Sequence, residues 1–93
     1  MGTGELKLFQ EIWATRPRRS EVSGDELPYF SVDCFSHILT KGAYPAARLD
    51  PDNIMLMTGV EHVQWEVQRW KCEGDPRWDK VYDRQLELKR KYL

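Results

Sequence analysis

The chain has 93 residues, of which 41% are hydrophobic and 12% aromatic, and its 14 basic and 15 acidic side chains give a net charge of −1. This length allows one small domain, and the apolar content is too high for a disordered chain. The balanced charge excludes binding to nucleic acid through overall charge alone, and no apolar run approaches the roughly 20 residues of a membrane span.

The first half of the sequence predicts a helix, a hairpin turn, a strand and a loop, in that order. Apolar side chains recur on one face of residues 5–15, which predicts an amphipathic helix. Gly24 and Asp25 are typical of a hairpin turn, and the aromatic and β-branched residues of 29–38 indicate a strand. The segment 40–52 is rich in glycine and proline and predicts a loop, and long ordered loops in small domains are commonly functional.

The second half predicts a short strand and two helices. Residues 53–57 indicate the strand, and Thr58 with Glu61 matches a capping box, so a helix is expected from there to about residue 71. A last helix is predicted over residues 76–92. The helix after Thr58 is expected to bury four apolar side chains: Val60, Val63, Val67 and Trp70. Together these elements predict a single α+β domain over residues 1–93.

Two histidines and an asparagine stand at the ends of these elements. His37 lies at the end of the first strand, Asn53 opens the second strand, and His62 lies in the first turn of the following helix. A neutral imidazole is a natural general base near neutral pH, and histidine is also a common metal ligand. Glu66 follows His62 by one helical turn and adds a carboxylate on the same face.

This order of residues resembles the HNH (His-Asn-His) endonuclease family, including small members found in phage and bacterial genomes. Asn-Ile-Met-Leu-Met at 53–57 is similar to the family's strand that begins with asparagine. Many members carry two Cys-x-x-Cys pairs, where this chain has Ser20 with Ser23 and Thr58 with Glu61. Because both halves of the zinc clip are replaced, no structural zinc is expected.

The resemblance implies a ββα-metal core over about residues 20–71, flanked by the two terminal helices. It implies that His37 is the general base, that Asn53 orients this base, and that His62 with Glu66 binds one Mg²⁺ or Mn²⁺. The implied activity is hydrolysis of DNA phosphodiester bonds by a single-metal mechanism. The implied location is the cytoplasm of a bacterial cell or of a phage-infected host.

The sequence departs from the family at Ser36, the position before the base. Many members carry an aspartate or histidine metal ligand there, and a serine hydroxyl is a weaker third ligand. An alternative function therefore stays open, in which a degenerate HNH module binds DNA or a protein partner without cleaving DNA.

Three basic side chains near the histidines are predicted to bind DNA phosphates. Lys41 and Arg48 lie in the loop beside His37, and Arg69 lies on the helix about two turns after His62. Most of the other charged residues are expected to be solvated, because acidic and basic residues are nearly equal in number.

The two cysteines, Cys34 and Cys72, are far apart in the sequence and do not form a disulfide framework. A reduced, cytoplasmic protein is expected on this ground. With His37 and His62 the two thiols make an alternative zinc set, but their spacing matches no common zinc module. We expect both cysteines to be small buried side chains of the core.

Overall fold

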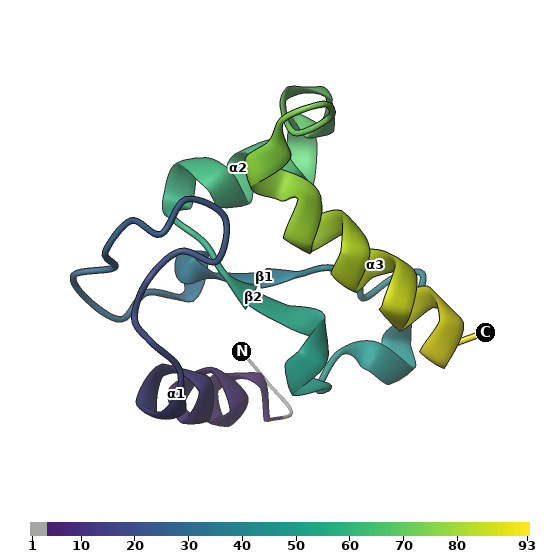
Figure 1. Cartoon of the computed structure of the whole chain (residues 1–93). Coiled ribbons are helices and arrows are strands. Elements are labelled where there is room, and N and C mark those ends of the chain that lie inside the picture. Colours follow the sequence, from purple (N-terminus) through teal and green to yellow (C-terminus); the bar gives the residue numbers. More distant parts are fainter. Residues whose placement is uncertain (1–3) are drawn as a thin grey trace.

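The computed structural model describes residues 4–93. These residues form three α-helices and two short strands: α1 (Glu5–Thr15), β1 (Phe35–His37), β2 (Ile54–Leu56), α2 (Gly59–Val67) and α3 (Asp79–Lys91). The strands pair antiparallel, with Ser36 opposite Met55. Helix α1 covers one face of this hairpin, and α2 and α3 cover the other (Figure 1). The predicted α+β class is confirmed.

Strand β2 divides the core into two clusters because its successive side chains point to opposite faces of the hairpin. Ile54 and Leu56 pack in the cluster that contains Phe9 and Ile12 of α1. The alternate side chains of this segment join a second cluster with residues of α2, of α3 and of the turn that precedes α3: Met55, Met57, Trp65, Trp78, Val81 and Leu88. The hairpin is therefore buried on both faces, which explains the continuous apolar run in this part of the sequence.

Both strands are shorter than the sequence predicts. The predicted strand over 29–38 is reduced to the three residues of β1, because the Ser31 side chain accepts a hydrogen bond from the Asp33 N–H and starts a 3₁₀ turn at Val32–Cys34. Asn53 also lies in a 3₁₀ turn and not in β2. Each of the two strands is thus preceded by a 3₁₀ turn.

The segment after α1 closes the outer edge of β2. The Glu21 N–H donates to the Leu56 carbonyl at 2.8 Å, and the Leu56 N–H donates to the Glu21 carboxylate at 2.7 Å. The Arg16 guanidinium donates to the Ile54 carbonyl at 2.6 Å. The turn predicted at Gly24 is present, with a φ of 82°, and it folds this segment back on itself. Open strand edges recruit other chains, so this cover protects the hairpin.

The helices begin close to the predicted positions. Helix α1 has the predicted bounds, and α3 follows a 3₁₀ turn at Pro76–Trp78 that belongs to the predicted helix over 76–92. Helix α2 ends earlier than expected, at Val67, and a 3₁₀ turn at Arg69–Lys71 follows it. Within residues 4–93, no helix is both long and apolar enough to cross a membrane.

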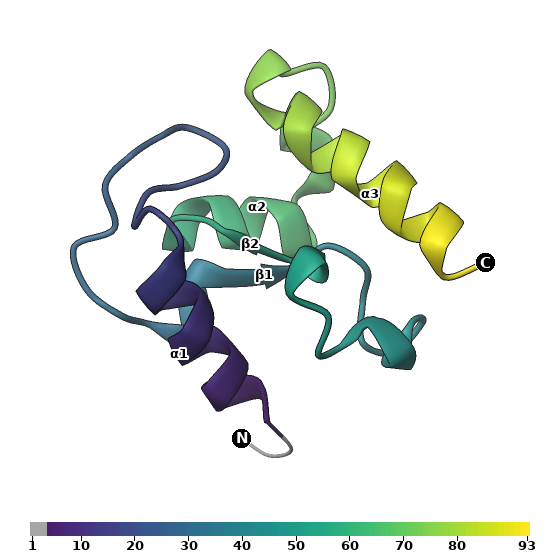
Figure 2. The same cartoon turned by 60° about the horizontal axis from the view of Figure 1, so that its bottom comes forward.

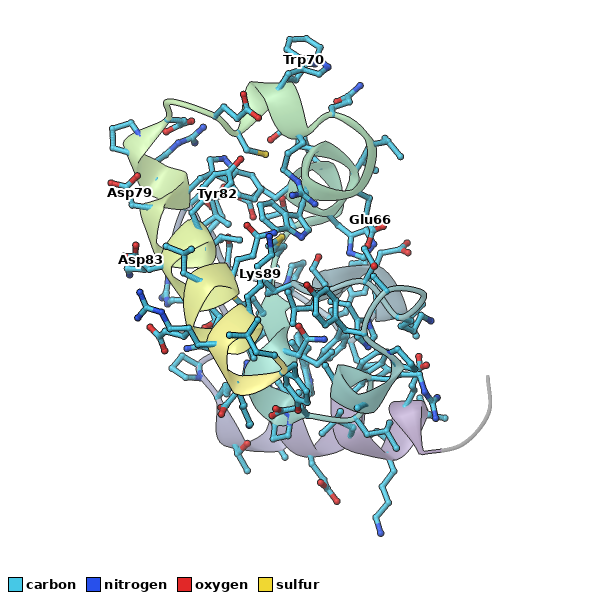
Figure 3. All side chains as sticks on the ribbon, turned by 90° about the vertical axis from the view of Figure 1, so that its right-hand side faces the viewer. Glu66, Trp70, Asp79, Tyr82, Asp83 and Lys89 are labelled. Carbon is cyan, nitrogen blue, oxygen red and sulfur yellow. The ribbon has the colours of Figure 1, made fainter. Side chains whose placement is uncertain are left out.

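The buried face of α2 is not the predicted one. Glu61 and Trp65 are buried, whereas the four side chains predicted to be buried are 48 to 73% exposed: Val60, Val63, Val67 and Trp70. Glu61 faces inward because it accepts a hydrogen bond from Ser20, and Trp65 faces inward because it stacks on Trp78. Trp70 instead projects from the end of the molecule (Figure 3).

Helix α3 is attached near both of its ends. At its start, the Trp78 ring stacks on Trp65 with a centroid distance of 5.9 Å. At its end, the Lys91 ammonium and the Tyr92 hydroxyl each donate to the Asp50 carboxylate at 2.6 Å. Asp50 also begins the 3₁₀ turn that leads into β2. The C-terminal helix therefore holds the end of the loop between the two strands.

The predicted capping box at the start of α2 is confirmed, and its contribution to stability can be measured. The Thr58 hydroxyl accepts from the Glu61 N–H at 3.2 Å, and the Glu61 carboxylate accepts from the Thr58 N–H at 2.9 Å. We expect Thr58→Ala to lower the free energy of unfolding by about 1 kcal/mol, because one N–H of the first turn loses its acceptor. Urea unfolding measures this change. Thr58→Ser keeps the hydroxyl and serves as the control; equal unfolding free energies for Thr58→Ala and the parent would contradict the cap.

Candidate functional site

A pocket of about 470 Å³ lies between the first turn of α1, the end of β1 and one face of α2. Figure 2 shows β1 between these two helices. Both histidines of the chain line the pocket, together with Lys41 and two carboxylates, Glu5 and Glu66. Aromatic rings and valines form the rest of the wall. The structure thus brings together three of the residues that the sequence predicted for catalysis and metal binding.

His37 is held in one tautomer at the end of β1. Its Nε2 lies 3.0 Å from the carbonyl oxygen of Arg48. Because a carbonyl can only accept a hydrogen bond, Nε2 carries the proton of the neutral ring, and the lone pair is on Nδ1. Burial lowers the pKa of His37, and the Arg48 carbonyl and Glu5 carboxylate only partly offset this effect. The ring is therefore neutral near pH 7 and is able to accept a proton.

Asn53 is fully buried and binds the loop after β1. Its Oδ1 accepts from the Leu39 N–H at 2.6 Å, and its Nδ2 donates to the carbonyls of Leu39 and Ala47, both at 3.1 Å. Both N–H groups of the amide are used in this way. The predicted orientation of His37 by Asn53 is therefore indirect: Asn53 fixes the loop, and Arg48 in that loop supplies the carbonyl that holds the histidine.

His62 lies in the first turn of α2 and has a partner at each ring nitrogen. Its Nδ1 is 2.7 Å from the Ser36 hydroxyl, and its Nε2 is 3.6 Å from a carboxylate oxygen of Glu66. Ser36 is fully buried, with its hydroxyl directed at the histidine. The prediction of Ser36 as a metal ligand is therefore corrected: its hydroxyl is placed to position the His62 ring.

His62 and Glu66 form a ligand pair suited to a hard or borderline divalent ion. Among residues 4–93, no group of three or more His, Cys, Asp or Glu side chains is close enough to hold a metal ion. Mg²⁺ needs few protein ligands, because it keeps several waters and binds substrate phosphates, at ligand distances of about 2.1 Å. Two ligands of one such ion are roughly 3 Å apart, which is close to the 3.6 Å between His62 and Glu66. The pair therefore fits a site completed by water and phosphate.

The alternative zinc site that includes both cysteines is not assembled. Cys34 and Cys72 are buried and belong to the two core clusters on opposite faces of the hairpin. Burial raises the pKa of both thiols. Both cysteines therefore act as small core side chains, as the sequence predicted.

Two of the three predicted phosphate-binding cations meet beside the pocket, at a carboxylate that the sequence did not single out. The Arg48 guanidinium donates to Glu5 at 3.0 Å, and the Lys41 ammonium lies 3.5 Å from the same oxygen. Burial raises the pKa of Glu5, but the two cations outweigh this effect and the pKa is lowered overall. A glutamate in the first turn of an amphipathic helix has no distinguishing signal in the sequence, because its neighbours depend on how the helix packs.

The third predicted cation, Arg69, has a packing role. Its guanidinium carbon lies 3.4 Å from the centroid of the Trp65 ring, and its Nε donates to the Trp65 carbonyl at 2.7 Å. The residues within 4–93 that line the pocket do not include Arg69. The prediction that it binds DNA beside His62 is not supported by this arrangement.

The four residues at the zinc-clip positions meet in what we call the polar cluster: Ser20, Ser23, Thr58 and Glu61. The Ser20 hydroxyl donates to the Glu61 carboxylate at 2.5 Å and accepts from the Ser23 N–H at 3.1 Å. The same Glu61 oxygen accepts from the Thr58 N–H. Ser20 and Glu61 are buried, so these hydrogen bonds join the segment after α1 firmly to the start of α2, where His62 lies.

The chain matches no family model, no curated protein and no solved structure. The function is therefore argued from the residues and from their geometry. A neutral histidine with a fixed tautomer, a histidine–carboxylate pair and a nearby cation line one pocket, and this combination is suited to acid–base chemistry on an anionic substrate.

Proposed function

We propose that the chain is a divalent-metal-dependent DNA endonuclease of HNH type, which hydrolyses phosphodiester bonds by a single-metal mechanism. One observation carries this proposal: the pocket is lined both by His37, whose Nε2 proton is held by a carbonyl, and by the His62–Glu66 pair. Phosphodiester hydrolysis needs a base for water and a cation for the phosphate. The two parts of the pocket correspond to these two needs.

In this mechanism His37 removes a proton from the attacking water through Nδ1. The ring then carries a positive charge, and the Arg48 carbonyl stabilises it by accepting the Nε2 proton in a hydrogen bond. His62 and Glu66 would hold Mg²⁺ or Mn²⁺, which when bound polarises the scissile phosphate and stabilises the leaving oxygen. Ser36 contributes by accepting from Nδ1–H of His62, which leaves the Nε2 lone pair available as a ligand.

Plasmid nicking in the presence of Mg²⁺, Mn²⁺ or EDTA tests the proposed function. We expect nicking with either metal and none with EDTA. His62→Ala is expected to weaken Mn²⁺ binding, measured by calorimetry, so that a higher Mn²⁺ concentration partly restores its nicking rate. Glu87→Gln, an exposed change on α3, is the control. Unchanged Mn²⁺ affinity in His62→Ala would show that the metal is bound elsewhere.

A degenerate module that binds DNA or a protein partner without cleavage is the second candidate function. It is favoured by the small ligand set, since Ser36 is directed at His62 and only one histidine and one carboxylate remain. DNA binding of equal strength with Mg²⁺ and with EDTA, and no nicking under either condition, would support this alternative.

A further inference from the structure

The Glu5 carboxylate is placed where an anionic substrate group would have to bind. It reaches from the first turn of α1 into the pocket that His37 lines, and its side chain is only 12% exposed. Both cations that it contacts, Lys41 and Arg48, come from the loop after β1. Arg48 is thus shared by two contacts: its guanidinium binds Glu5, and its carbonyl holds His37.

The Glu5 contacts have the same chemistry as contacts to a phosphate. A carboxylate oxygen and a phosphate oxygen are both anionic acceptors, and lysine and arginine bind both through charge-assisted hydrogen bonds. While Glu5 occupies this place, its charge compensates Lys41 and Arg48. A phosphodiester that approaches His37 therefore meets cations that are already paired, and it also meets the negative charge of Glu5.

Glu5 is not needed to hold α1 on the hairpin. The helix is anchored by Phe9, which stacks on Phe35 at a centroid distance of 4.5 Å, and by the buried Ile12. Rotation of the Glu5 side chain in the first turn would remove its carboxylate from Lys41 and Arg48 without moving these anchors. The contact can therefore open and close while the fold stays intact.

We propose, as an inference that rests on the nuclease function, that Lys41 and Arg48 form a phosphate subsite beside His37, and that Glu5 fills this subsite in the free protein. A backbone phosphate of DNA displaces the Glu5 carboxylate when it binds. Glu5 thus acts as an internal competitor that weakens the binding of DNA and, through α1, couples the N-terminal helix to substrate entry.

The test compares Glu5→Gln with Glu11→Gln in binding to a fluorescein-labelled 12-base-pair DNA duplex, with EDTA present so that no cleavage occurs. Both variants lose one negative charge from the same helix, but Glu11 is exposed. We expect Glu5→Gln to bind the duplex about three- to tenfold more tightly than Glu11→Gln. The slope of log Kd against log salt concentration should also be larger for Glu5→Gln, by about the contribution of one phosphate contact.

A second substitution separates competition from a general charge effect. Lys41→Ala is expected to weaken duplex binding more in the Glu5→Gln background than in the parent, because Glu5 compensates the Lys41 charge only in the parent. Equal affinity of the two glutamine variants, weaker binding by Glu5→Gln, or no duplex binding by any variant would overturn the subsite. These binding measurements are made without metal and without cleavage. If Glu5→Gln binds the duplex more tightly as expected but the protein does not nick DNA, only the nuclease function is contradicted.

Discussion

Replacement of His37 by alanine is expected to lower the rate of metal-dependent DNA nicking by roughly 10²–10⁴-fold, the usual contribution of a positioned general base. The Nε2 proton of His37 is held by the Arg48 carbonyl, so Nδ1 is the only basic nitrogen that the ring offers to water. The proposed metal ligands are on α2 and are not changed. We therefore expect His37→Ala to bind Mn²⁺ as tightly as the parent in calorimetry, in contrast to His62→Ala.

Rescue of His37→Ala by free imidazole gives a second test of the role of His37 as the base. The pocket is open to solvent, so free imidazole in the buffer should restore part of the His37→Ala rate, and it should do so more strongly as the pH rises above the pKa of imidazole. His62→Ala should not respond in this way, because its defect is in metal binding. A rate for His37→Ala within about threefold of the parent rate would remove the histidine from the mechanism.

Replacement of Asn53 by alanine is expected to have the largest effect on stability, a loss of about 3 kcal/mol in the free energy of unfolding. The change leaves the N–H and the carbonyl of Leu39 without the Asn53 side chain, and the Ala47 carbonyl keeps only the Asp50 N–H as a partner. For a domain of this size, such a loss is a large part of the total stability. Urea unfolding measures it, with the exposed neighbour Asp52 replaced by alanine as the control.

Asn53→Asp tests whether the amide hydrogens carry this effect. The aspartate has the same shape, but its second oxygen would face the Leu39 and Ala47 carbonyls in place of the amide N–H groups. We expect it to be destabilised at neutral pH and to recover part of its stability in acid, relative to the parent, because a protonated carboxyl can donate to one carbonyl. If Asn53→Asp is as stable as the parent at pH 7, the hydrogen bonds of Asn53 contribute little.

Local sequence signals predicted much of this fold. The capping box at Thr58 and Glu61 depends on residues three positions apart, so it could be recognised without knowledge of the tertiary structure. The face of α2 could not be predicted in the same way. Apolar periodicity assumes that the buried side is apolar, whereas here Glu61 is buried by a hydrogen bond to Ser20, which is 41 residues away in the sequence.

The candidate site was predictable in its α2 and β1 parts and not in its α1 part. His37 and His62 stand at the ends of elements, and their types suggest acid–base chemistry and metal binding. Glu5 enters the pocket only because α1 packs against the hairpin through Phe9, and Ser36 changes role because its hydroxyl is buried against His62. Both facts depend on contacts between elements that are distant in sequence.

The Ser20–Glu61 contact joins two segments that are 41 residues apart in the sequence. Two residue pairs that were matched to the halves of a zinc clip lie together in the polar cluster, where hydrogen bonds join them. Residues far apart in the sequence have no local reason to meet at these positions. The polar cluster therefore connects the segment after α1 to the start of α2.

The stacked rings of Trp65 and Trp78 give the protein a built-in optical reporter. The two rings are 5.9 Å apart and both are buried, so their strong indole transitions should couple and produce a paired signal in the far-ultraviolet circular dichroism spectrum. That signal depends on α3 remaining docked on α2, whereas the emission of the exposed Trp70 senses solvent. The two measurements together can therefore distinguish undocking of the C-terminal helix from local fraying at the end of α2.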